Sequence, residues 1–190
     1  LELIKHEYID DKQLFEIKDK NKVYDITVNL IGKIQIKNVL MAMIAAEKSN
    51  IKFEKIIKSI HKIKPINGRI EKIGYLKNSS KVILDYAHTT EALSNCLQSL
   101  EQQYKNRKIA IVFGCGGDRD KSKRSKMGKI ANKFCDKIYL TDDNPRFENP
   151  KKIRLSIKKS INKTKLYEIA NREKAISNAI QNLNSGELLL

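Results

Sequence analysis

The first part of the chain alternates between apolar and polar positions. Apolar residues recur with a period near two over residues 14–30, on either side of a polar turn at residues 18–21, and this pattern predicts a β-hairpin. After Gly32 the period becomes helical, first around residues 39–44 and again around residues 53–60, which predicts two helices. Residues 64–68 contain a proline and a glycine and therefore predict a linker.

Beyond residue 68 the pattern is strand, helix, strand, repeated. The expected strands are residues 81–85, 108–113, 137–141 and 166–169, and the expected helices are residues 90–104, a segment through Met127 and Phe134, residues 153–161, and a segment capped by Asn171. Residues 187–190 resemble the start of another buried strand. This alternation predicts an α/β fold with a doubly wound, mostly parallel sheet that carries helices on both faces.

Composition narrows the class of protein. Hydrophobic residues make up 41% and charged residues 32% of the 190 residues, and only three are proline, as in a soluble globular protein. The longest apolar runs, such as residues 39–46, are far shorter than the ~20 residues that cross a bilayer. We therefore expect neither a membrane segment nor a secretory signal.

The three cysteines are Cys96, Cys115 and Cys135. Their odd number and irregular spacing argue against a disulfide framework or a zinc site, which favours a cytoplasmic protein. Cys96 and Cys135 lie in apolar helical patterns and are expected in the core. Cys115 lies in a glycine-rich turn, where a nucleophilic function is an alternative, but no histidine is close to it in sequence.

The net charge of +16 permits a basic module that binds nucleic acid without catalysis. However, the excess is mostly lysine, is scattered from Lys5 to Lys174 and is not interleaved with aromatic residues, as base stacking would require. A bias in composition explains the charge equally well. We therefore expect no nucleic-acid partner, although an attraction for anionic small molecules remains in either case.

Two polar turns follow two of the expected strands. Gly114-Cys115-Gly116-Gly117-Asp118-Arg119-Asp120 follows one strand, and Thr141-Asp142-Asp143-Asn144-Pro145-Arg146 follows the next. Ligands of open α/β sheets collect at the carboxyl ends of the strands. Arginines and carboxylates would meet there, and a ligand with both charge signs, such as an amino acid, would suit such a site.

These turns also belong to an ordered set of motifs. The set comprises Gly68-Arg69-Ile70-Glu71, Asp85-Tyr86-Ala87-His88-Thr89, the glycine-rich turn with Lys123-Arg124, and Asp143-Asn144-Pro145-Arg146. In order and spacing it resembles the Mur ligases of the MurE type, the UDP-N-acetylmuramoyl-tripeptide synthetases, from about residue 30 onward. The resemblance implies that residues 1–67 are the tail of a central ATPase domain and that residues 68–190 form a Rossmann-like C-terminal ligase domain.

The resemblance further implies an ATP- and Mg²⁺-dependent amide ligase of peptidoglycan synthesis. Such an enzyme activates the carboxylate of UDP-N-acetylmuramoyl-L-alanyl-D-glutamate as an acyl phosphate, which the amine of an amino acid then attacks. It also implies a cytoplasmic monomer that serves cell-wall biogenesis, cell shape and cell division. On this reading the chain is a fragment without ligase activity by itself, and no catalytic residue or metal ligand is assigned in it.

By resemblance, the amino-acid site contains Arg119, Asp143, Asn144, Pro145 and Arg146. Arginine's planar fork matches a carboxylate, and meso-diaminopimelate differs from lysine by a second zwitterionic centre that such a fork would bind. Lysine-adding relatives lack the arginine of the last motif, so Arg146 favours meso-diaminopimelate. The alternative substrate is lysine or another amino acid. The alternative without a binding function is that the last motif is a type I turn in which Arg146 is merely exposed.

By resemblance, the ATP site receives Asn38, Arg69, Asp85 and His88. Asn38 is expected to open a helix, where an N-cap is the alternative to contact with adenine. For Arg69 the alternative to contact with the nucleotide is a salt bridge between the two domains. For Asp85 the alternative is to cap the following helix. Gln35 departs from the asparagine that these ligases often carry.

Four charged residues flank the glycine-rich turn, namely Asp118, Asp120, Lys123 and Arg124. They form either an ion network that supports Arg119 or simply the solvated start of a helix. The sequence favours the solvated helix start.

Overall fold

A computed structural model describes residues 1–76 and 78–190. It divides into two compact units, one made of Leu1–Glu71 with Ser99–Lys105 and the other of Lys72–Gln98 with Asn106–Leu190. The expected domain boundary after residue 67 lies close to the point where the first unit gives way to the second.

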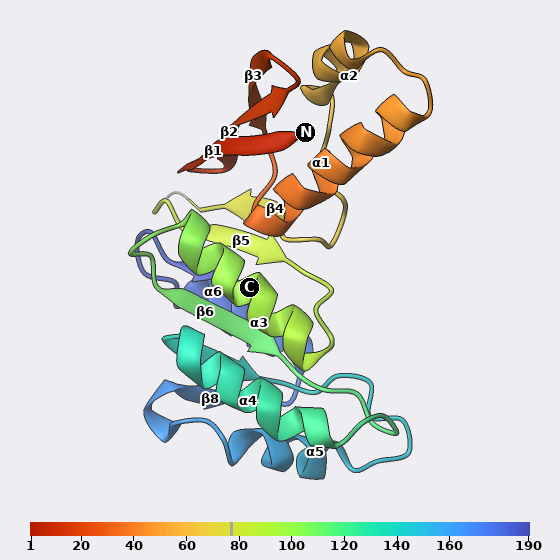
Figure 1. The fold of residues 1–190 in the computed structure, drawn as a ribbon. Helices are drawn as coiled ribbons and strands as arrows, with labels where there is room; N and C mark the ends of the chain where they lie inside the picture. The colour runs from red at the N-terminus through yellow and green to blue at the C-terminus, as the bar shows by residue number, and fades with distance from the viewer. Residues whose placement is uncertain (77) are drawn as a thin grey trace. The chain divides into compact units, whose positions relative to one another are not determined.

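The first unit contains a three-stranded antiparallel sheet and two helices (Figure 1). The strands are β1 (Glu2–Ile9), β2 (Lys12–Asp19) and β3 (Lys22–Val28), in that spatial order, and the helices are α1 (Lys33–Lys48) and α2 (Phe53–Ile60). Strands β2 and β3 pair from Gln13 with Val28 to Asp19 with Lys22. The predicted hairpin and both predicted helices are therefore confirmed.

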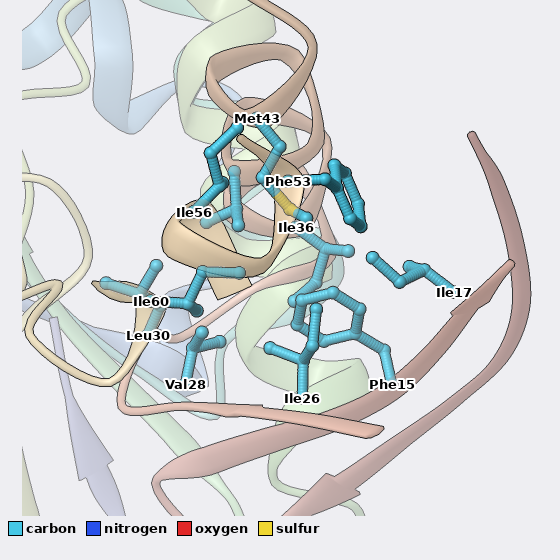
Figure 2. Close-up of a cluster of buried hydrophobic side chains, with 11 residues drawn as sticks. Phe15, Ile17, Ile26, Val28, Leu30, Ile36, Met43, Phe53, Ile56 and Ile60 are labelled. Atoms are coloured by element: carbon cyan, nitrogen blue, oxygen red, sulfur yellow. The ribbon is translucent and has the colours of Figure 1, made fainter. Parts of the chain in front are cut away.

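The core of this unit lies between the sheet and its helices. The apolar faces of β2 and β3 contribute Phe15, Ile17 and Ile26, and these side chains point toward Met43 of α1 and Phe53 of α2 (Figure 2). Because one face of the sheet is buried and the other is not, the period-two pattern was informative.

Two features of the first unit differ from expectation. Strand β1 extends the hairpin to three strands; its sequence, with charged residues throughout, lacks the clean alternation that identified β2 and β3. Helix α1 begins at Lys33 after Gly32, whose φ of 89° ends the preceding extended segment. The expectation that Asn38 opens the helix is therefore wrong, and its amide donates instead to Gln35 Oε1 within α1 (3.1 Å).

The second unit contains a six-stranded sheet in the order β4-β5-β9-β6-β7-β8. Its strands are β4 (Glu71–Tyr75), β5 (Lys81–Leu84), β6 (Ile109–Phe113), β7 (Lys137–Leu140), β8 (Leu166–Glu168) and β9 (Leu188–Leu189). The pairs from β5 through β9, β6 and β7 to β8 are parallel. The predicted α/β fold with a mostly parallel sheet is confirmed, whereas β4 was not foreseen.

Helices connect the successive parallel strands of this sheet. Chain order advances across the sheet through α3 (Thr90–Gln103), α4 (Ser122–Phe134) and α5 (Pro150–Lys158) and returns to β9 through α6 (Arg172–Gln181). Figure 1 accordingly shows α3 and α4 on one face and α6 on the other.

Capping decides where two of these helices begin. Asn171 caps α6 by accepting a hydrogen bond from the Lys174 amide (2.9 Å), as predicted. Helix α5 starts earlier than expected because the Asn149 side chain accepts from the Lys151 amide and Pro150 occupies the first turn. None of the helices in the described part of the chain is long and apolar enough to span a membrane.

Tyr139 of β7 offers a test of packing under α6. Its side chain is fully buried and stacks on the ring of Tyr167, with ring centroids 4.8 Å apart, but its hydroxyl has no hydrogen-bond partner among the described residues. Because an unpaired buried hydroxyl is destabilising, Tyr139→Phe should raise the free energy of unfolding by about 1 kcal/mol. Chemical denaturation measures this. Tyr167→Phe, at a half-exposed ring, should leave stability unchanged, and a destabilised Tyr139→Phe variant would contradict the expectation.

Candidate functional site

A cavity of about 620 Å³ lies at the carboxyl edge of the second unit's sheet. Its lining includes residues 85–88 after β5, residues 114–116 after β6, residues 143–144 after β7, Arg172 after β8 and Leu190 after β9. Parallel strands bring these loops together because all their carboxyl ends meet at one edge. The cavity is therefore formed within a single unit.

Most of the residues expected in the substrate and nucleotide sites line this cavity. They are Asp85, His88, Arg119, Asp143, Asn144 and Arg146. Pro145 belongs to the same loop but does not line the cavity, whereas Asn38 and Arg69 lie in the first unit. The structure thus brings Arg119 of one turn together with Asp143 and Arg146 of the other in one lining.

Two glycines allow the turns after β6 and β7 to approach each other closely. A Cβ atom at Gly117 would overlap the Pro145 carbonyl, and one at Gly114 would overlap the Thr141 carbonyl. Hydrogen bonds accompany this approach, since the Gly117 amide donates to the Asn144 carbonyl (2.8 Å). The glycines serve close packing of two loops here, as expected of a turn that must keep space for a ligand.

Arg146 lies across this contact. Its Nη1 donates to the Gly117 carbonyl (2.7 Å), and its backbone amide donates to Asn144 Oδ1 (3.2 Å). The Arg146 φ of 48° lies in the left-handed region, which most side chains avoid. One edge of the guanidinium is thus oriented by the neighbouring loop, while the residue itself remains exposed and lines the cavity.

The expectation of a solvated helix start is wrong for Arg124. This residue is only 3% exposed, and its guanidinium forms a two-pronged ion pair with Glu148, at 3.0 Å from Nη1 to Oε2 and 2.7 Å from Nη2 to Oε1. Arg124 lies on α4, where it is buried along with Met127, Gly128 and Ala131. Asp120 does follow the expectation, because it accepts from the Ser122 amide at the start of α4 (2.8 Å).

The segment after β5 is held by local hydrogen bonds. Asp85 Oδ1 accepts from the Ala87 amide (2.8 Å), and Lys123 Nζ donates to the His88 carbonyl (2.9 Å). Thr89, rather than Asp85, caps α3, since its hydroxyl accepts from the Ala92 amide (3.2 Å). The alternative of Asp85 as a helix cap is therefore wrong.

The His88 ring lies close to the backbone of its own loop. Its Nδ1 is 3.2 Å from the Tyr86 carbonyl oxygen, which only accepts, so this contact is a hydrogen bond when Nδ1 carries a proton. In that tautomer of the neutral ring, Nε2 is an acceptor. A hydrogen bond from Nε2 to an anionic oxygen would require the imidazolium form.

The cysteines behave as core residues. Cys96, Cys115 and Cys135 are free and buried, as expected for Cys96 and Cys135. Burial raises the pKa of the Cys115 thiol to about 11, so the thiolate that a nucleophile requires is scarce near neutral pH. Among the described residues, no group of three or more histidine, cysteine or acidic side chains is arranged to hold a metal ion.

Sequence reasoning missed Arg172 and Glu148. Arg172 lines the cavity from the first position of α6. Its place directly after the predicted strand at residues 166–169 is a signal that the sequence offers, because ligands collect at the carboxyl ends of parallel strands. Glu148 gave no such signal. Its partner Arg124 lies 24 residues away, and nothing local to either residue predicts the pairing.

The Arg124–Glu148 pair predicts a pH dependence of stability. Hydrogen bonds from Arg124 and from the Asp118 amide, with the charges of Arg124 and Lys121, lower the pKa of Glu148 from 4.5 to about 2 against the opposing influence of burial. A lowered folded-state pKa stabilises the fold above the unfolded-state value, and this contribution is lost as pH falls from about 4.5 through 2. Glu148→Gln should therefore lose less stability than wild type over this range in acid denaturation followed by circular dichroism. Identical acid profiles would contradict the assignment.

Comparison with known proteins identifies the same family for the whole of the second unit. Residues 68–190 match the family model of the Mur ligase glutamate ligase domain. The curated UDP-N-acetylmuramoyl-L-alanyl-D-glutamate–2,6-diaminopimelate ligase of Rickettsia typhi is 42% identical over 90% of this chain and 34% of its own length. The ligase of the same name from Chelativorans sp. is 37% identical over 94% of this chain and 36% of its own length.

A solved structure of a ligase with that name is similar as well. It has a TM-score of 0.71 and 28% sequence identity, over 98% of this chain and 38% of the solved chain. The present chain thus spans about a third of the length of the relatives it matches. On the family match and these identities, the chain belongs to the Mur ligase family.

Proposed function

We propose that the whole protein adds meso-diaminopimelate to UDP-N-acetylmuramoyl-L-alanyl-D-glutamate, using ATP, in the synthesis of peptidoglycan precursors. The observation that carries this proposal is that Arg119, Arg146 and Asp143 line one cavity. Relatives 37–42% identical to this chain carry the name of that ligase. As further parts of the proposal, the enzyme is a monomer and acts in the cytoplasm, a reducing compartment in which free cysteines are usual.

In this proposal the cavity recognises both charge signs of the amino acid. Arg146, oriented by the Gly117 carbonyl, binds the distal carboxylate through the edge of its guanidinium that the loop does not use. Asp143 and Asn144, one position apart on the same loop, accept hydrogen bonds from the distal ammonium. Arg119, which has no hydrogen bond or ion pair within the described residues, takes the carboxylate at the other end. Lysine lacks the distal carboxylate, so Arg146 would have no partner there.

The proposal assigns residues 1–67 to the end of the central ATPase domain and residues 68–190 to the C-terminal domain. Asp85 and His88 are assigned to the nucleotide, together with Asn38 and Arg69 of the first unit. The chemistry of Asp85 and His88 fits this, because a carboxylate accepts from ribose hydroxyls and an imidazolium donates to phosphate oxygens. Bound ATP and Mg²⁺ would supply activation of the acceptor carboxylate, and no residue described here is assigned to the metal.

Binding of the amino acid tests the proposal directly, because the cavity lies within one unit. The chain, labelled with ¹⁵N, is titrated with meso-diaminopimelate and in parallel with L-lysine, and amide shifts are followed by NMR. We expect saturable shifts at residues 114–119 and 143–146 with meso-diaminopimelate and at least tenfold weaker binding of lysine, the value of about one charged hydrogen bond. Equal or tighter binding of lysine would overturn the substrate assignment in favour of a lysine-adding ligase.

A further inference from the structure

Glu148 does not line the cavity, but its carboxylate binds several groups of the neighbouring loop and helix. Its two carboxylate oxygens accept from both terminal nitrogens of Arg124, at 3.0 and 2.7 Å, and Oε1 also accepts from the Asp118 backbone amide at 2.7 Å. The more distant Lys121 ammonium lies 3.7 Å from Oε2. One side chain from the loop after β7 is thus bound to both the loop after β6 and helix α4.

The contact between the two loops is reciprocal. Asp118 Oδ2 accepts from the Phe147 amide (3.0 Å), while the Asp118 amide donates to Glu148. Arg124 Nη2 also lies 3.4 Å from the Gly116 carbonyl, which places the guanidinium against the glycine-rich turn. The loop that carries Arg119 and the loop that carries Arg146 are therefore joined through Glu148 and Arg124.

This arrangement is a costly way to obtain stability alone. Arg124 is buried and Glu148 is mostly buried, and burying charges removes them from water, so that replacement of such a pair by apolar residues is often neutral or stabilising. The Arg124 Nε is buried and has no hydrogen-bond partner among the described residues, which adds a further cost. Hydrogen-bonded ion pairs are directional, whereas apolar packing is not. The pair therefore fixes one distance and orientation between the two loops.

We propose that Glu148 is a positioning residue that acts through Arg124 and Asp118 to set the spacing of Arg119 and Arg146 for the amino acid. This inference rests on the proposed function, because it concerns the same cavity. A bidentate contact between guanidinium and carboxylate requires placement within about 0.5 Å. Loss of the Glu148 charge should therefore weaken ligand binding without removing any group that touches the ligand.

The test is a comparison of meso-diaminopimelate affinity in four forms of the chain. They are wild type, Glu148→Gln, Arg146→Ala and the double variant, each titrated by NMR. If Glu148 acts by placing the arginines, Glu148→Gln should weaken binding about tenfold in the wild-type background but less than about twofold when Arg146 is already absent, because coupled residues are not additive. Equal factors in both backgrounds, or no loss in Glu148→Gln, would overturn the proposal.

Glu187→Gln is the matched control for a general effect on stability. Glu187 is a buried carboxylate that pairs with Lys137 (2.7 Å) and precedes β9, at the amino edge of the same sheet. The Glu187→Gln substitution should lower the melting temperature of the chain while leaving its affinity for meso-diaminopimelate unchanged. An affinity loss in Glu187→Gln equal to that in Glu148→Gln would show that the effect is one of stability only.

A measurement without ligand separates this inference from the proposed function. In Glu148→Gln, hydrogen exchange of the Gly117, Asp118 and Phe147 amides should accelerate about tenfold, since their acceptors lie across the joined loops. The amides of β6 should keep their wild-type protection. Unchanged exchange at the three loop amides would overturn the positioning inference, whereas failure of wild type to bind meso-diaminopimelate would instead overturn the proposed function.

Discussion

Arg146→Ala should weaken the binding of meso-diaminopimelate about 10-fold to 150-fold, which corresponds to the roughly 1.5 to 3 kcal/mol of a charged hydrogen-bonded contact. The reason is that the substitution removes the free edge of the guanidinium, which the hydrogen bond from Nη1 to the Gly117 carbonyl holds in place. NMR titration or calorimetry with the labelled chain measures the loss.

Two comparisons make this result specific. Arg146→Lys keeps the charge but not the planar fork, so it should bind meso-diaminopimelate with an intermediate affinity. Lysine as ligand lacks the distal carboxylate, and its weak binding should be the same in wild type and in Arg146→Ala. Unchanged affinity of Arg146→Ala for meso-diaminopimelate would remove Arg146 from the site and with it the argument for this substrate.

Gly117→Ala should weaken meso-diaminopimelate binding roughly 100-fold, the effect of a displacement of about 1 Å in a site of fixed geometry. The added Cβ would overlap the backbone carbonyl of Pro145, and a backbone atom can give way only if the two loops separate. Separation would move Arg119 away from Arg146. Affinity is measured by NMR titration, and circular dichroism reports whether the sheet remains folded.

Two other glycines provide a graded series. A Cβ at Gly116 would come closest to the end of the Arg146 side chain, at 2.9 Å from Nη1, and would lie 3.4 Å from the Asn144 carbonyl oxygen. Gly116→Ala should therefore shift the guanidinium and cause a smaller loss. Gly74→Ala is the control, because nothing lies within 4 Å of its added Cβ. Wild-type affinity in Gly117→Ala, or the same loss in Gly74→Ala, would contradict the expected effect of loop separation.

The sequence alone was sufficient for most of the elements. Residues that are buried on one face of an element, such as Phe15 and Ile17 of β2, recur with the period of that element. Asn171 predicts the start of a helix because its side chain caps the first turn. The elements that escaped prediction lack such a signal. Charged residues recur along β1, and β4 is a short strand with only partly buried or exposed positions.

The candidate site divides in the same way. That Arg119, Asp143 and Arg146 would meet could be predicted, because strand order and the parallel sheet bring the loops after β6 and β7 to one edge. The insertion of β9 between β5 and β6, and the burial of Arg124 against Glu148, could not. Periodicity and helix caps depend on residues that are close together in the sequence, so they can be predicted from it. The partner of a buried charge depends on which distant segments pack together, and only the tertiary structure shows that. For this protein, local pattern determined which residues stand at the cavity, and tertiary contacts decided how their spacing is held.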